Sequence, residues 1–529
     1  MNKEKTGSAL LDWGLILFAC SLPWSNFGMS ISYFLMLGSL VLLPRQKKNA
    51  RSLKDISPAV SLIGTFLIFL IPVIYTQNLK EAIHDLNIKL PALLAGLIFL
   101  FQKETIPKLK NYERYLSLFS ISCLLAVGFS FFYFFYLDKN GIHDSRQASL
   151  FISHIRLSLM AALAVLIFLF QIQPEKKKSL LYLLPSAFMF LAIVYLGWIN
   201  GILAITLVIL VLAGFSFFPV SKKKILILSM MLVALVSFAS IEFNRLNKLF
   251  AIGPLPNSLP KETVNKNQYY HDTLLTFSEN GNRYGLYYQP EEFRKAWEKR
   301  SNLKTTQKDA KGNQVQYTCF RYLTSKGLGK DSLGVWQLSA EDIRNIELGI
   351  PNYQLPALMP FERRVYDYFV EWQSEGSIQS VNGHSLGMRT IYWKSGLQLI
   401  KENFLWGLGT GSVPDALKEY HQKKNKQLAE QFRNRSHNQY ITTFLNSGII
   451  GITLFLAFLL IPLLASQPLN PLTVGSWLVL MFSMLSEDTL ETQAGVGLFI
   501  WIMMIPALFQ ATVKPLRTIE DKNPLPYSN

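Results

Sequence analysis

The chain has few charged residues and almost no cysteine. Only 16% of its 529 residues are Asp, Glu, Lys or Arg, against roughly 25% in soluble proteins. Its three cysteines, Cys20, Cys123 and Cys319, are too few and too scattered for a disulfide framework or a metal cluster. No internal repeat and no low-complexity tract is present. The composition therefore excludes an ordinary soluble protein and a disulfide-stapled scaffold.

The chain is rich in long apolar runs. Half of its residues are hydrophobic, and many runs are long enough to cross a bilayer. We expect an all-α polytopic membrane protein with about 12 transmembrane helices and one large periplasmic loop region of mixed structure. The predicted spans lie near residues 8–24, 27–43, 57–75, 88–102, 116–137, 150–170, 180–197, 199–218, 225–241, 438–464, 471–486 and 494–512.

The distribution of lysine and arginine predicts the orientation. With the N-terminus inside, the cytoplasmic segments carry 20 of these residues and the short outer loops carry 4. Because basic residues stay on the cytoplasmic side, both termini are expected in the cytoplasm. The net charge of +17 then reflects topology more than nucleic-acid binding, and we expect no nucleic-acid partner.

This topology divides the chain into four regions. Residues 1–241 form a membrane region of about nine spans, and residues 242–437 form the large loop outside the cytoplasm. Residues 438–512 add about three spans, and residues 513–529 form a cytoplasmic tail. A bilayer is therefore the first expected partner.

Several elements are predicted within the large loop. The alternating pattern and the β-branched and aromatic residues of Gln314–Thr324 predict a short strand. Ser339–Leu348 begins with serine and has acids in its first turn, which predicts a helix. Arg389–Lys401 and Asp415–Arg433 are also predicted to be helices, with the turn Gly407–Gly411 between them.

His437 is the first candidate for chemistry. It lies where the loop meets an apolar run, so an imidazole that titrates near neutral pH is placed at a water–lipid boundary. His437-Asn438 is followed, after nine residues, by Gly448-x-x-Gly451. The alternative is structural: Asn438 or Ser436 caps the helix and the glycines permit close helix packing.

Two arginines are the next candidates. Arg389 opens an amphipathic segment near the membrane surface, where its guanidinium suits a lipid-linked phosphate. Arg156 lies inside the sixth predicted span, and such a cation usually faces a cavity or a partner. The alternatives are a salt bridge or a solvated position for Arg389, and snorkelling to the interface for Arg156.

Weaker candidates lie elsewhere. Arg321 and Lys326 belong to a segment, Arg321–Asp331, that resembles a phosphate-binding turn without the spacing of a nucleotide P-loop. A glycan contact and a structural turn both remain open for it. The carboxylates Asp415, Glu419, Glu487, Asp488 and Glu491 show no spacing typical of a metal site or a glycosidase pair.

Together these residues give the chain a resemblance to the O-antigen ligase family, which is grouped with O-antigen polymerases and O-oligosaccharyltransferases. The motif from His437-Asn438 to Gly451 is similar to the ligase pattern. Arg389 and Trp393 before the glycine turn are similar to the family's arginine–tryptophan helix, and Arg156 is similar to an arginine in an earlier span. One departure is the hinge Ile199-Asn200-Gly201, where many members have Ser-Arg-Gly.

The resemblance implies a glycosyltransferase of the bacterial inner membrane, without cofactor or catalytic metal. It would move a glycan from undecaprenyl diphosphate to lipid A-core at the periplasmic face. His437, Arg389 and Arg156 would be catalytic, and Asn438, Arg321, Lys326 and Trp393 would bind substrate. A polymerase, or a protein O-oligosaccharyltransferase with a protein acceptor, would keep this chemistry. A polysaccharide flippase is the alternative from another class.

Overall fold

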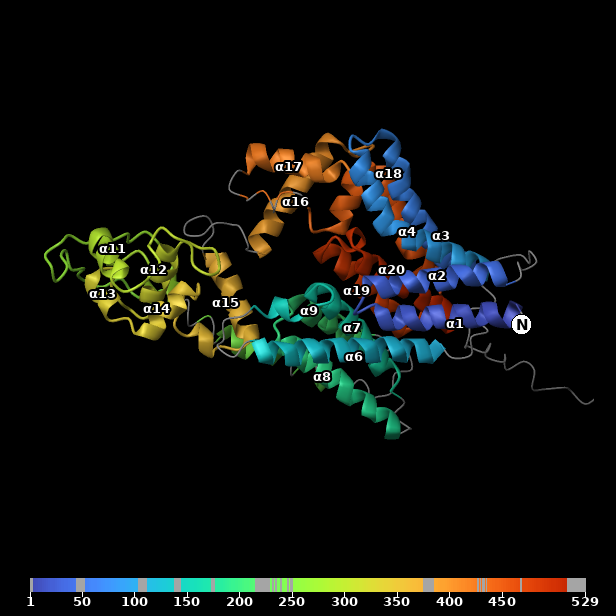
Figure 1. Cartoon of the computed structure of the whole chain (residues 1–529), viewed down its shortest axis with the longest axis horizontal. Helices are drawn as coiled ribbons and strands as arrows, with labels where there is room; N and C mark the ends of the chain where they lie inside the picture. Colours follow the sequence, from blue (N-terminus) through green and yellow to red (C-terminus); the bar gives the residue numbers. More distant parts are fainter. Residues whose placement is uncertain are drawn as a thin grey trace, which may run out of the picture.

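The computed structural model describes most of the chain, and the described part is predominantly helical. It covers residues 3–43, 53–102, 112–137, 144–172, 177–214, 251–373, 385–425, 435–466 and 469–510, with scattered positions at 229–247 and 428–433. Figure 1 shows a body of long helices on the right and a smaller group of short helices on the left.

Eleven of the twelve predicted spans contain a helix in the described part of the chain. The predicted span 225–241 lies largely outside the described residues. The fourth helix begins at Leu79, earlier than predicted. The helices are α1 (Lys3–Ser21), α2 (Asn26–Leu42), α3 (Leu53–Leu70), α4 (Leu79–Gln102), α6 (Tyr112–Leu137), α7 (His154–Phe170), α8 (Leu183–Tyr195), α9 (Ile199–Gly214), α18 (Gln439–Ala465), α19 (Pro471–Ser486) and α20 (Gln493–Gln510).

Length and hydropathy identify part of these helices as candidate membrane spans. Among the described residues, five segments are long and apolar enough to cross a bilayer, and five further helices are apolar but shorter. Such lengths suit the hydrocarbon thickness of a membrane. The chain is therefore a helical membrane protein, while the number of about 12 spans stays a prediction.

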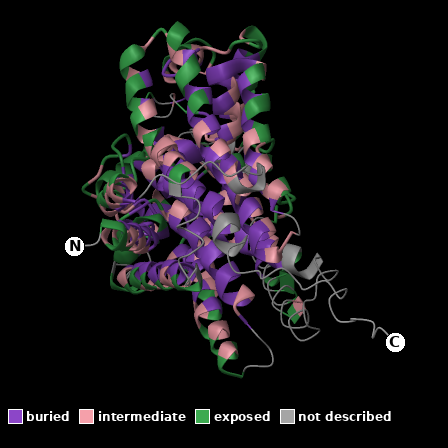
Figure 2. Cartoon of the chain, turned by 90° about the vertical axis from the view of Figure 1, so that its right-hand side faces the viewer, coloured by how far each residue is buried: buried purple, intermediate pink, exposed green. Residues whose placement is uncertain are grey.

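The core of the body is helix α7. Every residue from Leu157 to Leu169 is buried, so this helix is apolar all round because other helices cover it on all sides. Trp477 of α19 and Trp501 of α20 are also fully buried in the same core. Figure 2 shows the buried residues following the middle of the helical body. This packing holds the helix ends that carry the site.

The loop region between residues 251 and 373 has small hydrophobic cores of its own. A two-residue hairpin, β1 (Ser278–Glu279) with β2 (Asn282–Arg283), pairs antiparallel. One core gathers around Trp297, Phe320 and Tyr322, and a second around Phe277 and Tyr366. The helices are α11 (Pro290–Glu298), α12 (Val315–Ser325), α13 (Ser332–Trp336), α14 (Ala340–Glu347) and α15 (Pro360–Gln373).

The predicted strand Gln314–Thr324 is wrong, because this segment forms helix α12. Val315, Cys319, Tyr322 and Leu323 are all buried there. Every residue from Thr318 to Ser325 is buried, so neighbouring elements cover this helix nearly all round. The β-branched and aromatic composition had suggested a strand, but tertiary packing overrides that local preference.

The three predicted loop helices exist with changed ends. Ser339 caps α14 and forms a capping box with Asp342, as the serine start indicated. The segment Arg389–Lys401 lies within α16 (Ser385–Glu402). The predicted helix Asp415–Arg433 is shorter: α17 runs from Val413 to Lys424, and the chain leaves helical geometry at Asn425.

Helix α18 is broken at Gly448, where another loop enters. Gly448 has φ +65°, inside an otherwise helical run. The amides of Leu408 and Gly409 donate to the carbonyls of Leu445 and Asn446, and Ile449 N donates to Phe404 O. The glycine turn that follows α16 therefore packs against α18 at its break, through backbone hydrogen bonds.

Gly448→Ala is expected to destabilise the protein strongly, since its Cβ would lie 2.1 Å from Leu405 O. Overpacking costs about 1–3 kcal/mol, and an alanine forced into this nearly glycine-only backbone region, at φ 65° and ψ −167°, adds roughly 1–3 kcal/mol. The apparent Tm of the detergent-solubilised protein measures this loss. Gly38→Ala is the control, because its Cβ would meet nothing closer than 3.8 Å. Equal Tm values for the two variants would contradict the close backbone approach.

Candidate active site

The candidate site is centred on the residues at the start of α18 and the turn after α19. His437 and Asn438 precede α18, and Glu487 and Asp488 follow α19. Glu487 is in extended geometry, with φ −150° and ψ 159°. Successive side chains of an extended segment point to opposite sides. The two carboxylates therefore serve different partners.

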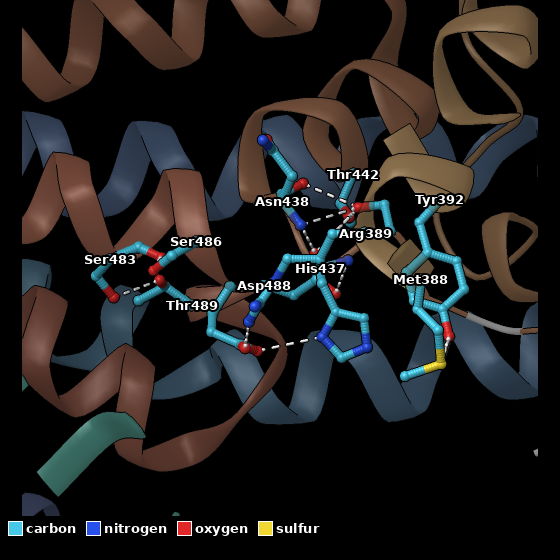
Figure 3. Close-up of polar contacts among 12 residues, drawn as sticks. Met388, Arg389, Tyr392, His437, Asn438, Thr442, Ser483, Ser486, Asp488 and Thr489 are labelled. Carbon is cyan, nitrogen blue, oxygen red and sulfur yellow. Dashed lines mark hydrogen bonds and ion pairs between the residues drawn. The ribbon is translucent and has the colours of Figure 1, made fainter. Parts of the chain in front are cut away.

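Asp488 holds the backbone that presents His437. Its carboxylate accepts the amides of His437 at 3.0 Å and Asn438 at 2.9 Å, together with the hydroxyls of Ser436 and Thr442. Figure 3 shows Asn438, Thr442 and Asp488 around the turn. His437 has φ +50°, a left-handed conformation that costs a non-glycine residue roughly 1–2 kcal/mol. Such strain persists where surrounding bonds enforce it, and it is concentrated at functional positions.

Asn438 is the N-cap of α18. Its side-chain oxygen accepts the amides of Tyr440 and Ile441, and its own amide hydrogens reach Leu485 O. These bonds satisfy helix-terminal donors. Asn438 therefore caps the helix, as the structural alternative predicted, and the imidazole of His437 takes no part in the cap.

The imidazole of His437 contacts Glu487 and Tyr392. Nδ1 lies 3.3 Å from Glu487 Oε2, and the ring stacks on Tyr392 with centroids 5.4 Å apart and planes at 29°. The two rings lie beside each other in Figure 3. Because an ionised carboxylate only accepts, Nδ1 carries the hydrogen and Nε2 keeps its lone pair. With 35% of its side chain exposed, His437 is accessible to a substrate proton.

Glu487 joins the histidine to Arg389. Its Oε1 accepts a hydrogen bond from Arg389 Nη2 at 2.9 Å, while Oε2 faces His437. Burial raises the pKa of Glu487, but the His437 hydrogen bond and the charges of Arg389 and Arg156 outweigh burial, and the pKa is lowered. A carboxylate that stays charged between the Arg389 guanidinium and the His437 N–H fixes the position of both.

Arg156 belongs to the same charge cluster without a direct ion pair to it among the described residues. It lies in the first turn of α7, and its charge lowers the pKa of Glu487. Its Nε is buried and has no hydrogen-bond partner within the described part of the chain. The same is true of Arg389 Nε and Trp393 Nε1. A buried N–H group without a hydrogen-bond acceptor is costly in a protein. Three such groups on Arg156, Arg389 and Trp393 therefore indicate a site that binds a hydrogen-bond acceptor.

A cavity of about 80 Å³ adjoins the cluster, and the three arginines that line it each pair with a carboxylate outside the lining: Asp144, Asp367 and Glu487. It is lined by Arg146, Arg364 and Arg389 and by the hinge residues Ile199 and Asn200, without a carboxylate in its lining. The hinge itself contributes no arginine to the cavity. Arg146 and Arg364 bring cationic charge to the same cavity from the α6–α7 connection and from α15.

Arg321 and Lys326 are not part of this cluster. Arg321 Nε donates to Glu279 at 2.8 Å, Nη2 donates to Tyr366, and the side chain is buried. Lys326 pairs with Asp342 at 2.7 Å. Both residues belong to or adjoin α12, which Figure 1 shows well apart from α16 and α18. These ion pairs and hydrogen bonds occupy both side chains, so neither residue belongs to the candidate site.

The sequence alone did not identify Glu487 and Asp488 as residues of the site. Neither residue has motif spacing, and their partners are about 50 or 100 positions away along the chain. A usable signal existed: adjacent acids directly after an apolar run, at a predicted outer helix end, are rare because charge is expensive at the membrane. The described residues contain no group of three His, Cys, Asp or Glu side chains that could hold a metal ion.

Comparison with known families gives a match over this part of the chain. Residues 348–456 match the family model described as O-antigen ligase. This match supports the O-antigen ligase family for the segment that carries the candidate site. No curated protein matches the chain.

The matched O-antigen ligase segment contains Arg389, Trp393, His437 and Gly448, the residues that carry the resemblance in the sequence. Its end at residue 456 leaves out Glu487 and Asp488, and its start leaves out Arg156. The structure therefore completes the cluster with side chains from outside the matched segment. The family supports a glycan transferase and a lipid-linked glycan as partner.

Asp488→Asn is expected to lower both stability and turnover. An amide cannot accept all four hydrogen bonds, and each unsatisfied buried donor costs about 1–3 kcal/mol. Turnover should fall about tenfold or more, because His437 loses the bond that sets its backbone. Asp415→Asn is the matched control, an exposed aspartate bonded to the Asn78 side chain. Wild-type Tm and turnover in Asp488→Asn would contradict the positioning role.

Proposed function

We propose that this protein is a glycosyltransferase of the O-antigen ligase type. It transfers a glycan from undecaprenyl diphosphate to a hydroxyl of lipid A-core at the periplasmic face of the bacterial inner membrane. The observation that carries the proposal is Glu487, whose two oxygens engage His437 and Arg389. One carboxylate thereby aligns a proton acceptor with a phosphate-binding cation.

His437 acts as the base in this proposal. Its Nε2 takes the proton of the acceptor hydroxyl as the oxygen attacks the anomeric carbon. Glu487 holds the Nδ1 hydrogen, so the ring is oriented and the resulting imidazolium is stabilised, as in other carboxylate–histidine pairs. The stacked ring of Tyr392 limits rotation of the imidazole.

The arginines receive the leaving group. As the new C–O bond forms, the bond to the carrier breaks and negative charge collects on the diphosphate. Arg389 and Arg156 offer buried N–H groups without partners among the described residues, and Arg146 and Arg364 add charge in the adjoining cavity. Attack without a covalent intermediate inverts the anomeric centre. The reaction as drawn requires neither a metal nor a cofactor.

The position of the cluster supports a periplasmic reaction. Its parts come from the connections between α6 and α7, α8 and α9, the large loop and α18, and α19 and α20. The charge bias of the loops predicts all four connections outside the cytoplasm. A carrier diphosphate at headgroup depth would reach such a site while its polyprenyl tail stays in lipid. Concentration of the polar residues at one end of the helices favours transfer over transport.

His437→Ala is expected to abolish transfer while leaving expression and membrane insertion unchanged. The assay offers purified carrier-linked glycan together with lipid A-core, a serine peptide and a glycan repeat unit as competing acceptors. His271→Ala is the matched control, a loop-region histidine bonded to Pro260 O and Tyr287 N. Full activity of His437→Ala would refute its role as the base. Glycosylation of the peptide instead of lipid A-core would change the acceptor assignment.

A further inference from the structure

The turn that follows α16 exposes three consecutive apolar residues, Phe404, Leu405 and Trp406, which we call the apolar tip. Trp406 is 65% exposed, Leu405 60% and Phe404 49%. Single exposed apolar residues are ordinary on a protein surface, but a contiguous group of large ones indicates an interaction surface. The hydrogen bonds between this turn and α18 use backbone groups, so they leave the side chains of Leu405 and Trp406 exposed.

The apolar tip is held between two candidate membrane spans. Trp406 O accepts a hydrogen bond from the Tyr75 hydroxyl at 2.6 Å, and Tyr75 is the last residue of the span that contains α3. On the other side, Ile449 N of α18 donates to Phe404 O at 2.9 Å. The ring of Phe404 also packs against Phe444 of α18, with centroids 5.6 Å apart. Figure 1 shows α16 running toward α18 and the end of α3.

Exposed apolar side chains continue from the apolar tip onto both spans. On the α3 side, Ile71 and Ile74 of the short helix η1 (Ile71–Tyr75) are 58% and 86% exposed. On the α18 side, Ile450 and Leu454 are exposed just beyond the contact with the tip. Exposed apolar residues on a membrane span face lipid. The apolar tip therefore extends a lipid-facing surface.

Lysines accompany the apolar residues on α16. Lys394, Leu397 and Lys401 are exposed and follow a spacing of three and four residues, so they share one face of the helix. Neither lysine makes an ion pair or a side-chain hydrogen bond within the described part of the chain. Lysine beside exposed tryptophan and leucine is typical of a membrane-interface segment. The ammonium group reaches the headgroups while the apolar side chains enter the lipid.

We propose that the apolar tip inserts into the outer leaflet of the bilayer and that Lys394 and Lys401 contact its phosphate headgroups. The end of α16 is then a membrane anchor, although it belongs by sequence to the large polar loop. α16 carries Arg389 and Tyr392 near its other end. One helix thereby joins the leaflet to the candidate active site and limits how far these two residues move from the membrane surface. This inference does not depend on the transfer chemistry.

Quenchers carried by lipid test the insertion, using the full-length protein reconstituted in phospholipid bilayers. The contribution of Trp406 to the fluorescence is the difference between wild-type protein and Trp406→Phe. We expect phospholipid with brominated acyl chains to reduce this contribution about twofold or more, and aqueous acrylamide to reduce it less. Trp336→Phe is the matched control, because Trp336 is 56% exposed but lies on α13 beside Arg300. Its contribution should be quenched by acrylamide and not by brominated lipid.

Lys394→Gln combined with Lys401→Gln tests the headgroup contacts. Wild-type protein should have a higher apparent Tm in bilayers that contain anionic phosphatidylglycerol than in phosphatidylcholine alone. The double variant should lose part of that increase, because each lysine near an anionic surface adds a favourable interaction. Lys423→Gln is the control, since its lysine pairs with Glu419, and it should keep the full increase.

The proposal is overturned if brominated lipid leaves the Trp406 contribution unchanged, because the apolar tip would then face water or a protein surface. An undiminished increase in Tm in the double lysine variant would refute the headgroup contacts. Both measurements are independent of glycan transfer. Failure of the proposed function in the His437→Ala assay would therefore leave the anchor standing, and failure of the anchor would leave the function standing.

Discussion

The arrangement of this site depends on two adjacent carboxylates at the end of α19. Glu487 is buried and charged because His437, Arg389 and Arg156 surround it, while Asp488 is bonded to the turn before α18. Buried charges are expensive unless they are paired and hydrogen-bonded. The pairing explains why a strained histidine turn and an arginine near the membrane persist together. Without Glu487 and Asp488, neither the turn at His437 nor Arg389 would be held in place.

Glycine supplies the second constraint. Gly448 and the turn at Gly407 let two backbones approach so closely that any Cβ would overlap a carbonyl or an amide. This contact joins the end of α16, which carries Arg389 and Tyr392, to the helix that follows His437. In the motif from His437 to Gly451, Gly448 therefore serves backbone docking, whereas His437 is the residue for which we propose a chemical role.

The sequence alone predicted the helical membrane class, the positions of most helices and three residues of the cluster. Periodicity and hydropathy are local properties, and they suffice for such features. They failed for α12, where composition resembled a strand while the segment packs as a helix buried nearly all round. They also failed for Glu487 and Asp488, whose roles come from partners far away along the chain. For Arg321, where the sequence left a glycan contact and a structural turn open, the structure has the side chain in a buried ion pair with Glu279.

The central claim is that Glu487 acts through His437. A double-mutant cycle on kcat/KM for transfer tests it most directly, using Glu487→Gln, His437→Ala and the pair. Glu487→Gln should lower kcat/KM markedly in the wild-type protein, since it loses the charge that orients the ring. In the His437→Ala background, adding Glu487→Gln should lower the residual rate much less, because only the ion pair with Arg389 is then left to lose. Equal losses in both backgrounds would show that Glu487 acts independently of the histidine and would contradict the account.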